Sequence, residues 1–349
     1  MVNSYLAVAT PPSFFTRYRS ELRDALTRGI SDGGLDLYDM LRYHMGWSDS
    51  QGRPTAGTEG KALRPNLCIF ACEAVGGTWR KALPAAVALE FIHNFSLIHD
   101  DIQDEDEERH HRPTLWYVWG KPKALVAGNA LRLMADMSLR RLRGEGLSLT
   151  KALEACELLS GAYLEMIEGQ YLDLSYEGRL SISVDDYLAM IGKKTGALIS
   201  CAMHVGALIG SENRDTIEAF RKSGLALGQA FQVWDDCLGI WGDEEVTGKP
   251  VGADIRKKKN SFPVVYTMAH AQGHDKEILT TIYSKTKLDD GDVKQVLAIM
   301  EQVDARTSSQ RLAEQQCGAA LEALSGVELV PRVMEELIDL GNFLITRKY

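Results

Sequence analysis

The chain of 349 residues lacks the features that mark secreted, membrane-spanning or nucleic-acid-binding proteins. Its first residues, MVNSYLAVATPP, contain no basic residue and no long apolar run, so we expect no signal peptide. No run of about eighteen apolar residues occurs, and no membrane span is therefore expected. The net charge of −9 disfavours nucleic acid as a partner. The six cysteines form no CxxC pair, which favours a reduced cytoplasm over a disulfide framework or a zinc site.

Strand patterns are missing as well, because no long segment alternates apolar and polar residues. Apolar residues instead recur with the helical period of about 3.6 residues, and Ser183 with Asp186 has the spacing of a capping box at a helix start. The predicted helices cover residues 14–28, 35–43, 65–74, 81–107, 122–143, 150–174, 183–208, 213–241, 262–271, 276–284, 291–301, 305–324 and 331–346. Since short loops join them without a shift of composition, we predict one all-α domain over residues 1–349, a single large helical bundle.

The most informative stretch is acidic and ends a long apolar helix. Seven carboxylates occur in the nine residues from Asp100 to Glu108, directly after the apolar run 85–98. Asp100 and Asp104 share a helix face, and Asp101 lies one step round it. Carboxylates this close repel one another unless a cation lies between them, and Mg²⁺ suits because it takes carboxylate oxygens and recruits phosphate oxygens. The alternative, a solvated acidic helix end, fits the charge run but not the apolar lead-in.

A second acidic pair lies at a matching position, at the end of the helix predicted over residues 213–241. Asp235 and Asp236 follow an apolar stretch, with Gln232 three residues earlier on nearly the same face as Asp235. Asp243 follows after a break at glycine. Two carboxylate clusters at the ends of two long helices could face each other across the bundle and hold several Mg²⁺ ions around one diphosphate.

Basic residues accompany both clusters. Lys61 and Arg64 lie three apart at a predicted helix start, where backbone N–H groups also favour anions. Lys194 lies with Lys193 and Thr195 in the middle of an apolar helix, where charged side chains are rare unless they are paired or functional. The others, each a surface residue by default, are Arg109, Arg112, Lys249 and the run 257–259. Arginine suits bidentate phosphate binding, and lysine acts as a point charge.

Taken together, these motifs resemble the trans-prenyltransferases, the polyprenyl (isoprenyl) diphosphate synthases. The matching segments, in the order and spacing of that family, are GKALRP at 60–65, FIHNFSLIHDD at 91–101, DDIQD at 100–104, GQYLD at 169–173, KTG at 194–196 and FQVWDD…GD…TGK…D at 231–254. The resemblance covers residues 55–265. The segments HRPT at 111–114 and GIWGD at 239–243 are most similar to a bacterial subgroup that makes geranylgeranyl-type products.

The resemblance implies an isoprenoid-synthase bundle with a central apolar cavity and a head-to-tail (1′–4) condensation of isopentenyl diphosphate with an allylic diphosphate. It implies about three Mg²⁺ ions, bound by Asp100, Asp104 and Asp235, with Asp101, Asp236 and Asp243 nearby. It assigns the allylic substrate to Arg109, Lys194, Thr195, Gln232 and Lys249, with Lys259 after the second motif. It assigns isopentenyl diphosphate to Lys61, Arg64 and His93. It also implies a homodimer.

Two positions depart from the family pattern. His110 stands where a second arginine usually contacts isopentenyl diphosphate, and histidine is only partly charged near neutral pH. Gly239 stands where the second motif usually has its third acid. Three other functions remain open on the sequence: a class I terpene cyclase, a non-catalytic partner subunit, and a carboxylate di-metal bundle. The last would need Glu-x-x-His pairs on two separate helices, and the sequence places all of its pairs in one stretch.

The length of the product is expected to depend on the helix that carries the first motif. Ser96 lies four residues before Asp100, about 6 Å deeper, and Phe95 lies five before, about 7.5 Å deeper. In the resembled family, an aromatic residue five positions before the motif with a small residue four positions before it looks like the pattern of enzymes that make C20 products. The sequence therefore predicts geranylgeranyl diphosphate as main product, with farnesyl diphosphate as the alternative. The starter (dimethylallyl, geranyl or farnesyl diphosphate) is left open, as is the reading of Phe95 as a plain packing residue.

Overall fold

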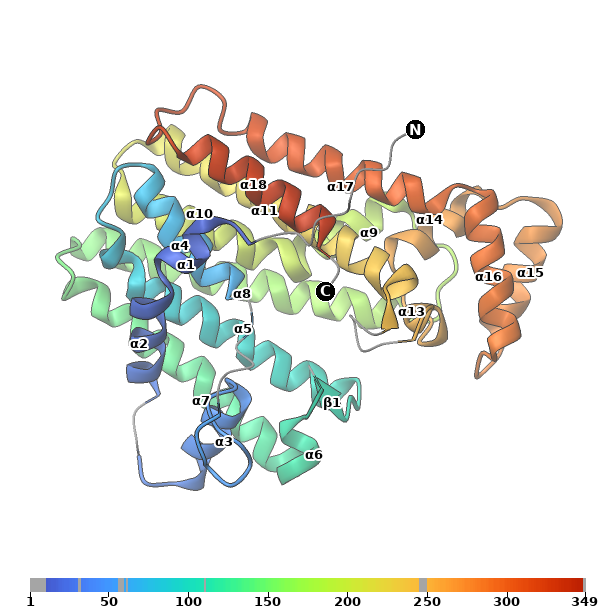
Figure 1. Ribbon diagram of the computed structural model, residues 1–349, viewed down its shortest axis with the longest axis horizontal. Helices are drawn as coiled ribbons and strands as arrows, with labels where there is room; N and C mark the ends of the chain where they lie inside the picture. The colour runs from blue at the N-terminus through green and yellow to red at the C-terminus, as the bar shows by residue number, and fades with distance from the viewer. Residues whose placement is uncertain are drawn as a thin grey trace.

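The computed structural model describes residues 11–30, 33–55, 60, 62–109, 111–244 and 250–347, and within them it is a bundle of long helices (Figure 1). The helices of the first half are α1 (Ser13–Arg17), α2 (Arg19–Gly29), α3 (Asp36–His44), α4 (Leu63–Ala74), η1 (Trp79–Ala82), α5 (Leu83–Gln103), α6 (Leu115–Trp119), α7 (Lys121–Leu139), η2 (Arg140–Arg143) and α8 (Leu149–Tyr176). Those of the second half are α9 (Val184–Ile191), η3 (Gly192–Gly196), α10 (Ala197–Gly210), α11 (Arg214–Trp241), α13 (Ala253–Arg256), α14 (Phe262–His270), α15 (Gly273–Ser284), α16 (Asp290–Gln302), α17 (Ala305–Glu322) and α18 (Val333–Thr346). The expectation of an all-α fold is confirmed.

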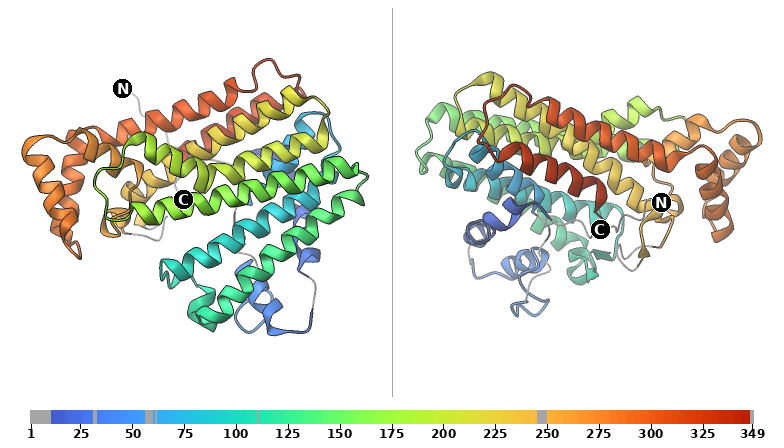
Figure 2. Two further views of the ribbon diagram at one scale, coloured as in Figure 1. Left: turned by 180° about the vertical axis from the view of Figure 1, so that it is seen from behind. Right: turned by 45° about the horizontal axis from the view of Figure 1, so that its top comes forward.

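The long helices lie side by side, and both ribbon views in Figure 2 show this layering. Helix α5 packs against α4 and α7, and α10 packs against α4, α8 and α11, while α17 covers α11. Helices α15 and α16 project at one end of the bundle (Figure 1). Most buried apolar side chains form one cluster that runs through α4, α5, α7, α8, α10 and α11. Two smaller apolar clusters lie outside it, one around α14–α16 and one where α9, α11 and α14 meet.

Helix α5 is long and largely apolar. With the turn before it, Trp79–Gln103 is apolar and long enough to cross a membrane by composition alone, but most of that span is buried within the bundle. Its side chains from Ala85 to Ile92 are almost all inaccessible to water. Helix α5 is therefore the central helix of the core, and its last turn carries the first acidic residues.

Three local features differ from the sequence-based expectations. Helix α5 ends at Gln103 and not at residue 107, because Glu105 has a positive φ of 53° and the Asp106 amide donates back to the Asp101 carbonyl at 3.1 Å. The chain then forms a short antiparallel pair of strands, β1 (Glu108–Arg109) and β2 (Arg112–Pro113), where only helix and loop were expected. The loop predicted over residues 242–259 contains the one-turn helix α13. The capping box of Ser183 and Asp186 is confirmed.

The helix expected over residues 183–208 is continuous but contains a π-helical segment, η3, between α9 and α10. Such segments hold one extra residue per turn and often occur at functional sites. A Cβ atom at Gly169 of α8 would lie 2.2 Å from the Lys194 nitrogen, so α8 and η3 pack backbone to backbone. Gly169 belongs to the GQYLD segment, and this close approach explains why glycine stands there.

Candidate active site

The first acidic cluster lies at the polar end of α5. The Asp104 amide donates to the Asp100 carbonyl at 2.8 Å, so both residues keep the helical face that the sequence predicts. Burial raises the pKa of the Asp100 carboxyl to about 6, and the neighbouring Asp104 adds to this, while Lys194 opposes it. Asp100 therefore carries a carboxylate whose charge the protein only partly compensates, which is what a cation site needs.

Asp101 has a different environment from its neighbours. Its side chain is 3% exposed, and Oδ1 accepts from Arg109 Nε at 2.8 Å and Nη2 at 2.7 Å. Burial raises the pKa of the Asp101 carboxyl, and Arg109 acts against that shift. This contact fixes the strand pair β1–β2 over the end of α5, so Asp101 positions Arg109 beside the acidic face.

The second acidic pair, at the end of α11, also divides into two environments. Asp236 is buried and accepts three hydrogen bonds, from the Tyr187 hydroxyl at 2.7 Å, the Phe262 amide at 2.8 Å and Gln232 Nε2 at 2.9 Å. Burial and the charge of Asp254 raise the pKa of Asp236, against these donors. The Thr195 hydroxyl donates to Gln232 Oε1 at 2.6 Å, which joins η3 to α11. Asp236 thus ties α9, α11 and α14 together.

Asp235, by contrast, has a side chain that is 40% exposed. Its Oδ1 accepts from Arg347, whose own side chain is 2% exposed. Arg347 also donates to the Phe231 carbonyl at 3.3 Å, and its guanidinium lies 4.0 Å from the Phe231 ring centre. The Trp234 indole donates to the Arg347 carbonyl at 2.9 Å. The last described turn of the chain therefore folds over the second acidic pair.

Basic side chains connect the two acidic ends. Lys194 pairs with Asp173 of α8 and also acts on Asp100. The pKa of Lys259 is raised: partial burial opposes the shift, but Asp254 and Asp104 outweigh it. Lys259 thus lies within electrostatic reach of a carboxylate beside each acidic pair. Lys257 pairs with Asp106 at 2.5 Å and adds a second bridge between the same segments.

Gly239, the departure in the second motif, has a structural explanation. A Cβ atom built at Gly239 would lie 2.0 Å from Asp254 Oδ2 and 2.6 Å from its Cγ. The carboxylate of Asp254 therefore lies directly against the helix position at which the third acid would stand. The sequence motif showed the missing acid, but only the structure shows which carboxylate lies in its place.

Arg64 lies in a buried polar group beneath the site. Its side chain is 9% exposed, and among the described residues its buried Nε has no hydrogen-bond partner. Burial lowers the pKa of Arg64, while Glu90 and Asp235 act to raise it. Glu90 is buried as well, and Asn94 Nδ2 donates to its Oε1 at 3.1 Å. A buried guanidinium with an unpaired donor can bind an anion. Glu90, which the sequence argument did not select, partly compensates the positive charge of Arg64.

The remaining predicted residues are placed as follows. His93 lies on α5, half-buried, and its carbonyl accepts from the Ser96 hydroxyl at 2.8 Å. Phe95 is 7% exposed, with its ring 5.5 Å from that of Tyr163 and 4.5 Å from that of His99. Lys61, His110 and Lys249 lie outside the described residues. Arg112, a candidate to assist His110, donates to the Ser48 carbonyl at 2.9 Å and stacks on Tyr43.

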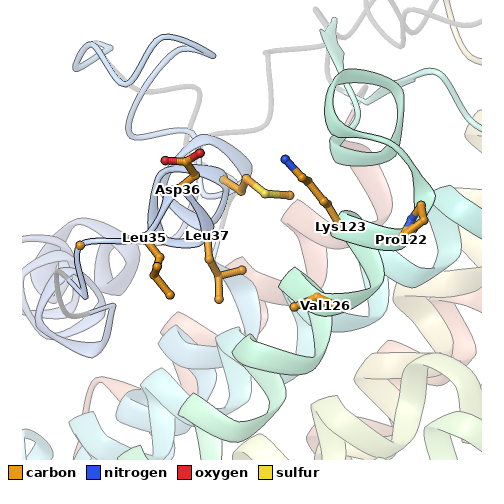
Figure 3. Close-up of a pocket in the computed structure, with 8 residues that line it drawn as sticks. Leu35, Asp36, Leu37, Pro122, Lys123 and Val126 are labelled. Carbon is orange, nitrogen blue, oxygen red and sulfur yellow. The ribbon is translucent and has the colours of Figure 1, made fainter.

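A cavity of about 520 Å³ lies elsewhere, between the start of α3 and the start of α7 (Figure 3). Leu35 and Leu37 line one side, with Pro122 and Val126 on the other. None of the predicted site residues that the structure describes lines it. The acidic helix ends and this apolar cavity are therefore separate features.

The acidic residues fit a shared metal site better than a protein-only one. In the described part of the chain, no three His, Cys, Asp or Glu side chains converge closely enough to hold an ion alone. Mg²⁺ in phosphate-handling sites takes only one or two carboxylates and completes its shell with water and phosphate oxygens. Asp100 with Asp104 at the end of α5, and Asp235 at the end of α11, offer carboxylate oxygens of the kind that such a site needs.

Comparison with known proteins decides the family. The polyprenyl synthetase family profile matches residues 49–300. The chain belongs to this family. It is 36% identical to a (2E,6E)-farnesyl diphosphate synthase of Mycobacterium bovis over 312 residues, 88% of this chain and 86% of that protein. It is 35% identical to a geranylgeranyl diphosphate synthase of Mycobacterium tuberculosis over 332 residues, 95% of this chain and 93% of that protein.

Solved structures agree with this assignment. A polyprenyl synthetase of Streptomyces coelicolor superimposes with a TM-score of 0.87 at 36% identity, over 95% of this chain and 99% of that one. A geranylgeranyl pyrophosphate synthetase of Pyrococcus horikoshii superimposes with a TM-score of 0.85 at 32% identity, over 96% and 98% of the two chains. The bundle is the isoprenoid-synthase fold, and this polyprenyl synthetase is an enzyme of prenyl transfer. The resemblance stated from the sequence motifs is confirmed.

Proposed function

We propose that this polyprenyl synthetase joins isopentenyl diphosphate head to tail (1′–4) to an allylic diphosphate, with Mg²⁺, and that geranylgeranyl diphosphate is its main product. The observation that carries the proposal is the pair of acidic helix ends with Lys259 within electrostatic reach of a carboxylate beside each. Two diphosphates need two anion sites, and Arg64 with its unused Nε supplies a second, buried cation. A terpene cyclase needs only one diphosphate, so the second site favours chain elongation.

The side chains divide the work of the reaction. Asp100, Asp104 and Asp235 would hold about three Mg²⁺ ions, which would neutralise charge on the departing diphosphate. Arg109, Lys194 and Lys249 stabilise the same charge. Thr195, Gln232 and Lys259 orient the allylic diphosphate, and Lys61, Arg64, His93 and His110 bind isopentenyl diphosphate. In the structure Lys194 pairs with Asp173, so on substrate binding the diphosphate replaces Asp173 as the anion beside Lys194.

The apolar interior protects the cationic carbon that forms when diphosphate leaves. Water in the site would convert that cation to an alcohol, and the core around α5 is closed to water. The double bond of isopentenyl diphosphate attacks the cation, and the released diphosphate accepts the proton that is lost. The chain's contribution is to bind, to orient and to exclude water.

The proposed C20 product rests on residues 95 and 96. Phe95 is buried at a depth of about 7.5 Å below Asp100, and the small Ser96 leaves the upper position open. Relatives of both chain lengths match this chain, one named for farnesyl and one for geranylgeranyl diphosphate. Farnesyl diphosphate is therefore the second candidate, and product analysis decides between them.

The decisive experiment incubates purified protein with Mg²⁺, isopentenyl diphosphate and each allylic starter, followed by chromatography of the dephosphorylated products. We expect C20 chains, a shorter product from Ser96→Phe and a longer one from Phe95→Ala. Asp100→Ala, Asp104→Ala and Asp235→Ala should each lower turnover by orders of magnitude, because each removes a metal ligand where charge develops. Glu107→Ala, in the same acidic run but beyond the helix, is the matched control. Turnover by the protein alone also rules out a non-catalytic partner subunit.

We further propose a homodimer, formed by α7 and α8. Exposed apolar residues recur along each helix at the spacing of a helix-packing seam: Val126, Leu133 and Met137 on α7, with the half-buried Ala130 between the first two, and Leu164, Ile167, Tyr171 and Leu174 on α8. The cavity of Figure 3 begins beside Val126 and extends the same apolar surface. Leu164→Glu should convert a dimer to a monomer in light scattering, and Ile338→Glu, at an exposed apolar position on α18, should not. The cytoplasm is the proposed compartment, in keeping with six free cysteines.

A further inference from the structure

A cluster beneath Phe95 combines aromatic and charged side chains. Tyr163 of α8 meets the Phe95 ring edge to face, with 5.5 Å between ring centres. The Arg132 guanidinium of α7 lies 4.7 Å from the centre of the Tyr163 ring. Arg132 Nη1 pairs with Asp136 at 2.6 Å, one turn further along α7. Phe95 therefore rests on a ring that is itself held by a charged pair.

The direction of α7 fixes the order of these residues in depth. Lys121 at its start pairs with Glu105 near the acidic end of α5, and the Ser138 hydroxyl near its end donates to the Pro84 carbonyl at the opposite end of α5. Helix α7 thus runs away from the acidic cluster. A Cβ atom at Gly128 would lie 2.6 Å from His99 Nε2 and 3.5 Å from the Phe95 ring, so Gly128 is level with Phe95. Arg132 follows one turn later, about 6 Å deeper.

Phe95 and the Arg132 pair would obstruct a growing hydrocarbon tail in different ways. An aromatic ring such as Phe95 is apolar and blocks a tail only by its volume, so it can be opened by a smaller residue. A guanidinium over an aromatic face, with a carboxylate beside it, loses favourable electrostatic contacts if an apolar chain is inserted. Arg132 is only 23% exposed, so water replaces these contacts incompletely.

We propose that Arg132, held on Tyr163 and by Asp136, is a second stop for the growing chain below Phe95. Phe95 sets the product of the wild-type enzyme, and Arg132 sets the longest product once Phe95 is removed. This inference rests on the proposed chain-elongation function. It assigns product specificity to α7 and α8 in addition to the helix that carries the acidic motif.

The two stops act in series, and combined variants test this. Phe95→Ala should lengthen the product to a new, sharp limit. Phe95→Ala/Arg132→Met should pass that limit and raise the ratio of longer chains by about tenfold, since methionine keeps the volume of the stem without the charge. Phe95→Ala/Arg132→Lys should stay near the limit of Phe95→Ala because the cation remains. The matched control is Phe95→Ala/Arg140→Met, which removes an exposed charge directly after the same helix.

Chromatography of dephosphorylated products gives the chain lengths, and incorporated isopentenyl diphosphate gives total turnover. Helicity and thermal midpoint by circular dichroism show whether each variant folds; if Arg132→Met does not, Phe95→Ala/Asp136→Asn, which removes only the counter-charge, takes its place. Identical product lengths for Phe95→Ala and the folded double variant would overturn the second stop. Absence of turnover in the wild type would instead overturn the proposed function, so the two failures are distinguishable.

Discussion

The contact between Gly239 and Asp254 predicts that Gly239→Ala lowers activity, although helix propensity alone predicts a gain in stability. Gly239 lies inside α11, and glycine to alanine at such a position ordinarily stabilises a helix by about 1 kcal/mol. The added methyl would lie 2.0 Å from Asp254 Oδ2, far closer than van der Waals contact allows. The carboxylate is the free end of a side chain, so it can rotate away. We therefore expect Gly239→Ala to fold normally, with a change in unfolding free energy within about 1 kcal/mol.

The expected cost of Gly239→Ala is functional. Displaced Asp254 no longer supports the electrostatic setting of Asp236 and Lys259, and losing a supporting group around a metal site typically costs about 10- to 100-fold in metal affinity or activity. Steady-state rates with varied Mg²⁺ measure this, alongside urea unfolding. The double variant Gly239→Asp/Asp254→Gly exchanges the two residues and should recover part of the loss. Wild-type kcat/KM and metal dependence in Gly239→Ala would refute the reasoning.

Three further predictions concern single side chains. Burial lowers the pKa of His44 to about 3, so below pH 6.5 the unfolded state binds a proton that the folded state does not. The free energy of unfolding should therefore be unaffected by this group above pH 6.5 and fall by about 2 kcal/mol by pH 5. Urea unfolding of His44→Gln should show a flatter dependence on pH. His110→Arg should lower the KM for isopentenyl diphosphate up to about tenfold, with the allylic KM unchanged, because Arg112 is anchored to Ser48; an unchanged KM would count against a phosphate-facing position. Arg347→Ala should raise Mg²⁺ affinity about tenfold in calorimetry, since its guanidinium pairs with Asp235, and equal affinities would mean that the pair coexists with metal.

The helical architecture could be predicted from the sequence because it depends on local periodicity. The helices, the capping box at Ser183 and the common face of Asp100 and Asp104 are set by neighbours a few residues apart. The expected boundary at residue 107 was wrong because seven clustered carboxylates looked like one helix. Glu105 in fact takes the left-handed region and ends the helical turn.

The site could be predicted only in part, because its motifs are local and its supporting contacts are not. The two acidic pairs and Lys194 were selected from the sequence. Arg347 meets Asp235 across 112 residues, and no spacing rule links them. Asp254 was recognised as a motif residue, but its contact with Gly239 depends on how α13 returns to α11. Such contacts follow from packing of the whole bundle.

The π-helical turn at Gly192–Gly196 makes the chain sensitive to a change of length by one residue. It takes up one residue more than an α-helix would, so α9 and α10 keep their apolar faces toward the bundle on both sides of the polar Lys194 and Thr195. Deleting Lys193 would restore regular hydrogen bonding and leave α9 and α10 nearly in place, but it would remove the wider turn that carries Lys194 and Thr195. Because Gly169 packs against the backbone of Lys194, the narrower turn would also lose this close contact with α8. Homologues should therefore vary in length in the loops around this turn and not within it.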